Sequence, residues 1–390
     1  MIMESIITKI REALDKVEEW IEYNEYKGYE PSDGLTSFLR PLTFNRRILE
    51  RILQQVGRQS PFNLRPLMGV KPLESTKARG YMALGYLDRY RLTGSKTYKE
   101  KASQCLNWLD QNKSDGWIGH GWGNAFPMVG RANSIKAHEP MLVWTSIIGH
   151  AFIDAYEMFR VERHLEIINS IIICILNLPT EKTETGICLS YVPSEQSSIH
   201  NSNMLAAGFL AKAAALTANE KAKIIAKQCM EYSCSRQLSN GSWYYGEAPV
   251  HHWIDNFHTG YNLDSLKRYI EATNDHEYDE KLRKGIRYFK EHFFNKDGCP
   301  RYYHNRTYPI DIQCSSQAIE TLTYFSDHDD ESLEMACRVA MWTIQNMQDR
   351  DGHFYYRIYP MGIKSKIPML HWGQATNYRA LAYLLRRLTN

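Results

Sequence analysis

The sequence predicts an all-α protein, an (α/α)6 toroid built as an incomplete barrel of helical hairpins with short β-hairpin-like loops at one mouth. The first observation behind this prediction is a loop of Asp or Asn, Gly and then an aromatic residue, which recurs near Gly116, Gly241, Gly298 and Gly352. A weaker copy lies near Gly186, and from there the copies are 55, 57 and 54 residues apart. A fixed period of this length indicates one repeated supersecondary unit.

The second observation is the helical pattern between the loops, where two amphipathic segments and a short turn fit each interval. The copy "NFHTGYNLDSLKRYIEAT", "NDHE", "YDEKLRKGIRYFKEHFF" shows this order, and Asn274 and Asp275 supply its turn. The expected helices, in chain order, are 2–25, 43–56, 76–92, 96–112, 141–160, 162–176, 201–217, 219–236, 256–273, 278–294, 311–326, 331–347 and 372–388.

The third observation is the apolar character of the last helix, "QATNYRALAYLLRRL". An open solenoid ends in polar caps, so an apolar last helix favours a closed ring, with first helices inside and second helices outside. The chain is expected to form one domain, 1–390, in which N-terminal helices within 1–60 close the ring and helix pairs repeat over 61–390. The helices at 2–25 and 43–56 are the candidates for completing the last pair.

Composition excludes several classes of protein. The chain has 390 residues, a formal net charge of +3 with interspersed signs and 43% apolar residues, which predicts a large core and no nucleic-acid partner. No stretch reaches the roughly 18 apolar residues of a membrane span. The eight scattered cysteines indicate buried free thiols and a cytoplasmic location. No Walker loop or GxGxxG motif occurs, so no cofactor and no metal is expected, and the oligomeric state is left open.

Function is expected at the mouth onto which the inner helices direct their N-termini. Four segments entering these helices are rich in polar and aromatic residues, namely 200–203, 251–261, 302–313 and 371–374. Helix capping explains one polar residue per helix. A structural hydrogen-bond cluster explains Asp255, His258 and Asn262, which share one helix face, as well as a site does. Four such clusters at one mouth favour a site.

The residue types at the mouth indicate the class of ligand. Aromatic faces beside polar groups suit sugar rings, and they also suit a carbocation through cation–π attraction. The converging helix N-termini, together with Arg301, Arg306 and Arg357, favour an anionic ligand over a cation. A glycan that carries a uronate or a phosphate fits both features.

Two strings, "QLSNGSW" at 237–243 and "QDRDGHF" at 348–354, resemble the Gln/Gly/Trp repeats of squalene cyclases and protein prenyltransferases, which are also α/α toroids. The string "SDHDDE" at 326–331 resembles the acidic proton-donor motif of class II terpene cyclases. It lies between an inner and an outer helix, at the end opposite the glycine loops, where a solvated turn with helix-capping acidic residues explains it. A terpenoid cyclase or prenyltransferase is therefore the less favoured alternative.

A second resemblance covers most of the chain, from "NSNMLAAGFLAKAAALT" through "HHWIDNFHTGYNLDSLKRYIEATND" and "YYHNRTYPIDIQCSSQAIETL" to "DGHFYYRIYPMGIKSKIPMLHWGQA". These segments are similar to a family of prokaryotic α/α-toroid proteins associated with surface-polysaccharide biosynthesis, within the six-hairpin and terpenoid-cyclase-like toroids. The resemblance implies a glycan or sugar-containing substrate and a cytoplasmic site of action, and it does not establish the reaction.

Related toroids include uronate lyases, epimerases and unsaturated-glycan hydrolases, and their chemistry suggests roles for residues of this chain. We assign Arg357 and Asn256 to a uronate carboxylate, His258 as base and Tyr303 as acid, with Asp255 as the fifth catalytic candidate. The expected substrate-binding residues are Trp117, Trp122, Asn201, Tyr244, Glu247, His252, Trp253, Tyr302, His304, Tyr308, Asp311, Tyr356, Trp372 and Gln374.

Two alternatives to lyase or epimerase chemistry remain open at this point. A six-hairpin glycoside hydrolase needs mouth carboxylates, for which Asp255, Asp311, Glu247 and Asp115 are available. A non-catalytic glycan-binding or scaffold protein needs none of these residues to react.

Overall fold

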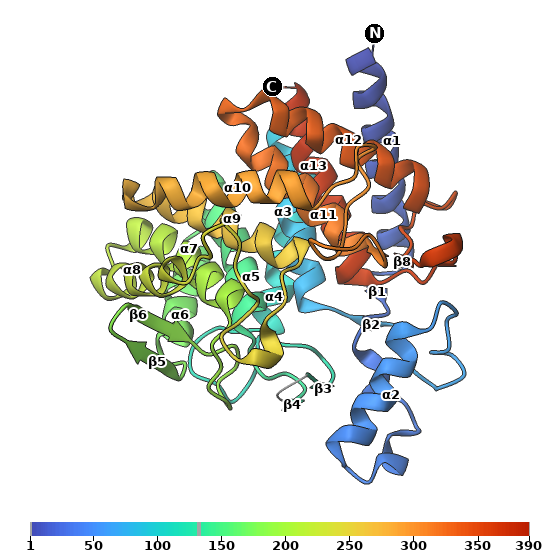
Figure 1. The fold of residues 1–390 in the computed structure, drawn as a ribbon, viewed down its shortest axis with the longest axis horizontal. Helices are drawn as coiled ribbons and strands as arrows, with labels where there is room; N and C mark the ends of the chain where they lie inside the picture. The colour runs from blue at the N-terminus through green and yellow to red at the C-terminus, as the bar shows by residue number, and fades with distance from the viewer. Residues whose placement is uncertain (1, 131–133, 390) are drawn as a thin grey trace.

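The computed structural model describes residues 2–130 and 134–389, and it confirms the (α/α)6 toroid (Figure 1). Within these residues six inner helices surround the axis, each followed or preceded by an outer helix. The inner helices are α3 (Thr76–Thr93), α5 (Leu142–Phe159), α7 (His200–Thr217), α9 (Asn256–Thr273), α11 (Ile312–Tyr324) and α13 (Thr376–Thr389). The outer helices are α4 (Lys96–Gln111), α6 (Glu162–Leu176), α8 (Glu220–Ser235), α10 (Asp279–His292), α12 (Asp330–Met347) and α1 (Ile2–Tyr23).

The ring is closed, because α13 packs against both α11 and α3. The sixth pair is α1 with α13, so one of the two N-terminal helices completes the barrel. The other, α2 (Arg47–Gln59), does not join the last pair. It packs beside β3 (Met128–Val129), where Gln54 donates to Val129 O and accepts from Val129 N. Figure 1 shows α2 and its flanking loops projecting beyond the toroid.

Inner helices differ from outer helices in the distribution of their apolar residues. Helix α5 is buried over nearly its whole length, since neighbouring inner helices and α6 cover it, whereas α10 buries one stripe and exposes charged residues. A helix that is covered on all sides is apolar all round. Gly149 of α5 faces Phe209 of α7 so closely that a Cβ there would lie 2.4 Å from the ring, and small residues thus allow close helix packing.

The recurring loop glycine joins each hairpin to the next outer helix. Five glycines combine a φ between +76° and +106° with a close approach, since a Cβ on any of them would lie 2.2–2.7 Å from a backbone carbonyl oxygen of the next outer helix. They are Gly119, Gly186, Gly241, Gly298 and Gly352. In the first copy the equivalent position is Gly119 and not Gly116, whose Cβ would meet nothing within 4 Å. Only glycine fits both the backbone conformation and the close approach.

We call each contact between a loop glycine and the next outer helix a joint. The strings that resemble Gln/Gly/Trp repeats lie at these joints. The Nε2 group of Gln237 donates to Gly241 O and to Lys281 O of the next outer helix, and Gln348 makes the matching pair of bonds to Gly352 O and Ala13 O. Trp243 is buried and donates through Nε1 to Ser233 O of the preceding outer helix. These residues therefore connect hairpins rather than contact a ligand.

The connections between the helices contain short antiparallel strands, as the loop pattern predicted. They are β1 (Lys27–Gly28) with β2 (Leu73–Glu74), β3 with β4 (Ser134–Ile135), β5 (Thr180–Thr183) with β6 (Gly186–Leu189), and a sheet of β7 (Ile310–Asp311), β8 (Arg357–Ile358) and β9 (Lys364–Ser365). The register of β7 and β8 sets Asp311 opposite Arg357. Strand pairing thereby brings Asp311 and Arg357, more than 40 positions apart in the sequence, into contact at the mouth.

The acidic string at 326–331 lies at the end opposite the mouth, as expected. Asp329 is the N-cap of α12, where it accepts a hydrogen bond from Ser332 N and forms an ion pair with Lys290. Among the described residues, no helix is long and apolar enough to cross a bilayer. All eight cysteines are free and buried.

The joints give a direct test of the fold. We expect Gly241→Ala to lower the free energy of unfolding by about 2–4 kcal/mol, because the methyl group meets Lys284 O at 2.5 Å and the residue has φ +94°. Gly116→Ala is the matched control, with φ +79° and open space, and we expect a cost of about 1 kcal/mol. Urea denaturation of both variants measures the difference, and equal losses would contradict the role of the joint.

Candidate functional site

The axis of the toroid contains two cavities. The mouth cavity, of about 590 Å³, lies at the N-terminal ends of the inner helices, and the second cavity, of about 510 Å³, lies among their C-terminal halves. Tyr81 and Tyr261 separate them, with their hydroxyl oxygens 2.9 Å apart. Tyr261 also accepts a hydrogen bond from Gln313 Nε2, so the floor of the mouth cavity is a buried polar network.

The structure brings eight of the predicted site residues together around the mouth cavity. They are Asn201, Trp253, Asp255, His258, Tyr302, Tyr303, Arg357 and Trp372. Two more stand directly behind this wall: Asp311 contacts Arg357 and Trp372, and Asn256 begins α9 with its backbone N–H donated to Tyr302 O.

The other nine predicted residues do not line the mouth cavity. Trp122, Tyr356 and Gln374 are fully buried, and Gln374 bonds both the N–H and the C=O of Phe354. His304 pairs with the Tyr288 hydroxyl, and Glu247 binds His200 and Arg236. Tyr244 stacks on His252 with ring centroids 4.4 Å apart. Trp117 and Tyr308 lie on exposed loops, 38% and 41% exposed.

His258 and Asp255 form an imidazole–carboxylate pair at the start of α9. Asp255 is the N-cap of this helix and accepts from His258 N, and its second oxygen lies 2.7 Å from His258 Nδ1. Trp253 Nε1 donates to the same oxygen at 2.9 Å. The carboxylate therefore fixes the ring with Nδ1 as the protonated nitrogen, and Nε2 is left for the cavity that His258 lines.

His371 and Glu30 form a second pair on the same cavity. His371 lies in the single π-helical turn η7 (Leu370–Ala375) that leads into α13. One oxygen of Glu30 contacts His371 Nδ1, and the other accepts a hydrogen bond from His371 N at 3.1 Å. Burial lowers the pKa of His371 below its usual range, against the opposing effect of Glu30, so the ring is neutral near pH 7.

Arg357 lines the mouth cavity and is held there by Asp311. Its Nε lies 2.5 Å from Asp311 Oδ2, and its Nη1 donates to Gln59 Oε1 at 3.3 Å. Trp372 donates through Nε1 to the other oxygen of Asp311 at 2.7 Å. Asp311 and Arg357 are both at most 3% exposed, so this pair orients Trp372 in the cavity wall.

Several buried polar atoms at the mouth have no hydrogen-bond partner among the described residues. They belong to cavity-lining residues and are Trp144 Nε1, Asn201 Oδ1, His371 Nε2 and Arg58 Nε. A buried polar atom without a partner costs about 1–3 kcal/mol, so such atoms are rarely left in a native protein. Their convergence on one cavity indicates a polar ligand.

Lys77 supplies a cation at the base of the cavity. It is 3% exposed, its Nζ lies 4.5 Å from the centroid of the Trp144 ring, and it donates to the Tyr261 hydroxyl at 3.4 Å. Burial lowers the pKa of Lys77 to about 7, while Glu30 opposes this shift. The ammonium is thus only partly protonated at neutral pH, and an anion bound near it would favour the charged form.

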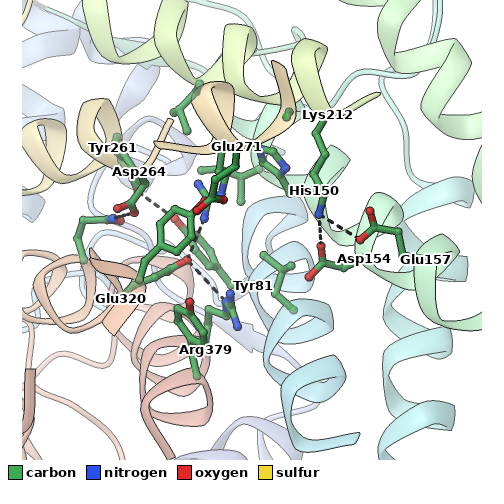
Figure 2. Close-up of a pocket in the computed structure, with 18 of the residues that line it drawn as sticks. Tyr81, His150, Asp154, Glu157, Lys212, Tyr261, Asp264, Glu271, Glu320 and Arg379 are labelled. Atoms are coloured by element: carbon green, nitrogen blue, oxygen red, sulfur yellow. Dashed lines mark hydrogen bonds and ion pairs between the residues drawn. The ribbon is translucent and has the colours of Figure 1, made fainter. Parts of the chain in front are cut away.

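The second cavity is more highly charged, but its charges are joined to one another (Figure 2). Asp154 of α5 bonds Lys212 of α7 and Arg91 of α3, which joins three neighbouring inner helices. Glu320 of α11 lies 3.6 Å from Arg379 of α13. Arg379 in turn forms an ion pair with Asp88 of α3, so these contacts hold the C-terminal halves of the ring together.

Several cavity residues were missed from the sequence, chiefly Glu30, Lys77, Trp144, Tyr245, His251 and His371. His371 lies within the 371–374 segment that was singled out, beside two residues that were chosen. Lys77 offered a weaker signal, a lysine in the first turn of an inner helix. Glu30 gave none, because it lies in a connection whose path only the fold determines.

No family model and no curated protein matches the sequence. Among solved structures, the cellobiose 2-epimerase from Bacillus thermoamylovorans B4167 superposes with a TM-score of 0.63 at 13% identity, covering 80% of this chain and 88% of that one. D-mannose isomerase gives 0.60 at 14% identity, covering 80% and 86%.

An α-1,6-mannanase, GH76A of Salegentibacter sp. HEL1_6, gives a TM-score of 0.59 at 13% identity and covers 82% of this chain and 90% of that one. Its structure is of an inactive variant, with two adjacent aspartates changed to asparagine, in complex with α-1,6-mannotriose. At these identities the likeness shows the fold alone. Helical toroids that process sugars therefore share the architecture of this chain.

The second cavity makes stability depend on pH. Burial raises the pKa of Glu320 to about 7, so the folded protein keeps a proton there that the unfolded chain loses near pH 4.5. The free energy of unfolding should then fall as pH rises from about 4.5 to 7. We expect Glu320→Gln to remove on the order of 3 kcal/mol of this fall.

Denaturation curves at pH 5 and pH 8 measure the effect. Glu100→Gln, at an exposed position of α4, is the control and should leave the fall unchanged. A fall of equal size in Glu320→Gln and in the unmodified protein would exclude Glu320 as its source.

Proposed function

We propose that this protein is a carbohydrate-active enzyme that moves a proton at the carbon next to a sugar carbonyl, as an epimerase or isomerase does. The observation that carries the proposal is the presence of two imidazole–carboxylate pairs, His258 with Asp255 and His371 with Glu30, on one cavity. Each carboxylate holds Nδ1 and leaves Nε2 as the nitrogen that exchanges protons with a substrate.

Two such imidazoles are what this chemistry requires. One Nε2 takes the proton as the C–H bond breaks, and the electron pair moves to the carbonyl oxygen to give an enediolate. The other imidazole must begin the step doubly protonated, and it returns the proton that its own Nε2 carries. The two rings thereby exchange protonation states, and proton exchange with solvent restores them after turnover. Delivery of the returned proton to the opposite face of the same carbon inverts that centre, and its delivery to the neighbouring carbon yields the isomer. Lys77, as a cation, would stabilise the enediolate oxygen.

The walls of the cavity support a sugar as the substrate. Trp253 and Tyr245 stack with ring centroids 4.5 Å apart, and Trp372 lies edge-on to Phe257 at 5.4 Å. Flat aromatic faces beside polar groups suit the C–H faces and hydroxyl edges of a pyranose. The epimerase and isomerase that share the fold are consistent with this choice.

We further propose that the substrate carries an anionic group, a uronate or a phosphate. Arg51, Arg58 and Arg306 line the cavity in addition to Arg357. Asp311 neutralises Arg357, and Asn256 is fully buried behind the cavity wall. We therefore expect Arg58, rather than Arg357 with Asn256, to contact the anion. Tyr303 stays a candidate acid, since it lines the cavity. The association with surface polysaccharides stays a prediction.

Glycoside hydrolysis is less well supported. The inactive mannanase variant implies that two adjacent aspartates matter in that enzyme. In this sequence the only Asp-Asp pair is at 329–330, far from the mouth. Three carboxylates line the cavity, and two of them, Glu30 and Asp255, are bound to histidines, so a proton-relay role uses those two as they stand.

Solvent proton exchange tests the proposal. The protein is incubated in D2O with reducing hexoses, disaccharides and hexuronates, and NMR follows deuterium at the carbon next to the carbonyl and any new epimer or isomer. We expect His258→Asn and His371→Asn each to slow turnover by about 10²- to 10⁴-fold, because each removes one proton-transfer group.

His276→Asn is the matched control, since His276 also contacts a carboxylate, Asp279, but is exposed and far from the mouth. We expect it to keep full activity. Release of a free sugar without exchange would instead indicate a hydrolase, and sugar binding without any reaction would indicate a binding or scaffold protein.

The charge of the substrate has a separate test. We expect Arg58→Gln to raise KM for a uronate or sugar phosphate by roughly 10- to 100-fold, because a charge-assisted contact is lost, and to change KM for the matching neutral sugar little. Steady-state kinetics on the two substrates measures this. An equal change for both would show that Arg58 does not select for the anion.

A further inference from the structure

Residues 34–72, which we call the arm, carry α2 and its flanking loops and project from the toroid at the lower right of Figure 1. The arm exposes large apolar side chains over its whole length. They are Phe38, Leu42, Phe44, Ile48, Leu49, Ile52, Val56, Phe62 and Leu67, from 38% to 78% exposed. An exposed apolar surface of this extent marks an interaction site.

Helix α2 exposes its apolar face and turns polar residues inward, the reverse of an ordinary surface helix. Ile48, Ile52 and Val56 follow i, i+4, i+8 spacing and form an exposed stripe, at 75%, 56% and 45% exposure. Its polar residues Glu50 and Gln54 face inward, where Glu50 pairs with Arg40 and Gln54 bonds Val129. Because these polar contacts fix the orientation of the helix, the apolar stripe faces away from the rest of the molecule.

The arm is strongly basic, whereas the rest of the chain is net acidic. It contains seven basic residues and one acidic residue, whereas the whole chain carries only +3, so the remaining residues sum to −3. Arg46 and Arg47 are exposed beside the apolar stripe. An apolar face flanked by arginines is typical of helices that lie in the interface of an anionic bilayer.

We propose that the arm binds the surface of an anionic lipid bilayer, with Ile48, Ile52 and nearby Phe44 inserted among the acyl chains and the arginines at the headgroups. A second copy of the chain fits less well, because a symmetric contact through this surface would bring the arginines of two arms together. A nucleic acid would leave the apolar residues in water.

This docking places the mouth cavity beside the lipid headgroups. Arg51, Gln55, Arg58 and Gln59 line that cavity from the other face of α2, so one helix has the apolar stripe on one face and the cavity wall on another. The enzyme would then take its sugar substrate at a membrane surface. Binding of the arm to lipid does not depend on the reaction proposed for the cavity.

Vesicle co-sedimentation tests the proposal, with phosphatidylcholine vesicles that contain or lack about a third of phosphatidylglycerol. We expect the protein to bind the anionic vesicles at least roughly tenfold more tightly, and salt to weaken this binding. The double variant Ile48→Ser with Ile52→Ser should lose binding at least roughly tenfold, and Arg46→Gln with Arg47→Gln should reduce mainly the salt-sensitive part.

Ile173→Ser with Ile224→Ser is the matched control, because these isoleucines are 49% and 55% exposed on the outer helices α6 and α8. It should bind as the unmodified protein does. Circular dichroism confirms that each variant is folded. Equal binding to neutral and anionic vesicles, or binding that the arm variants retain, overturns the proposal. A dimer in sedimentation velocity that the Ile48 and Ile52 changes dissociate, without vesicle binding, assigns the surface to a second copy.

Proton exchange on a soluble sugar is measured without vesicles, so its outcome is independent of the lipid test. Absence of vesicle binding by the unmodified protein, with exchange intact, rejects the docking surface alone. Vesicle binding with no exchange on any sugar rejects the proposed reaction alone.

Discussion

The contact between a loop glycine and a carbonyl oxygen of the next outer helix determines the geometry of the whole ring. A Cβ at Gly241 or Gly352 would lie 2.5 Å or less from that oxygen, so the spacing between hairpins is fixed by backbone atoms. The residues that follow each glycine then have set directions. Trp243 enters the core, whereas Tyr245 reaches the mouth two residues later; in the last copy Tyr356 is buried and the next residue, Arg357, lines the cavity.

This constraint explains which parts of the fold the sequence could predict. Helices with strong periodicity were predicted to within a few residues, and so were the loops, because a glycine with an aromatic neighbour recurs at a steady period. The local sequence indicates some helix ends and the pairing of the last helix less clearly. Arg160 and Ala218 end α5 and α7 with positive φ, a conformation that favours glycine or asparagine, so tertiary packing imposes it. The choice of α1 rather than α2 as the last outer helix also depends on contacts between the chain ends.

The site was predictable where a segment enters an inner helix directly, as His258 and Asp255 do. It was not predictable where a side chain is brought in by strand pairing or by a connection. Arg357 looked like an open cation in sequence, but the register of β7 and β8 places Asp311 opposite it and neutralises it. Glu30 comes from the path between α1 and the arm, and it reaches His371 across more than 300 residues of sequence.

The two cavities on one axis differ in a way that bears on chemistry. In the second cavity Asp154 and Glu320 are engaged with cations of neighbouring inner helices, so those charges mainly hold the barrel together. At the mouth, His258 and His371 each have a carboxylate on Nδ1. The N-terminal ends of six inner helices point to this cavity, and with Lys77 below them they favour negative charge. An enediolate forms more easily in such a field than at the C-terminal ends, where the helix dipoles would oppose it.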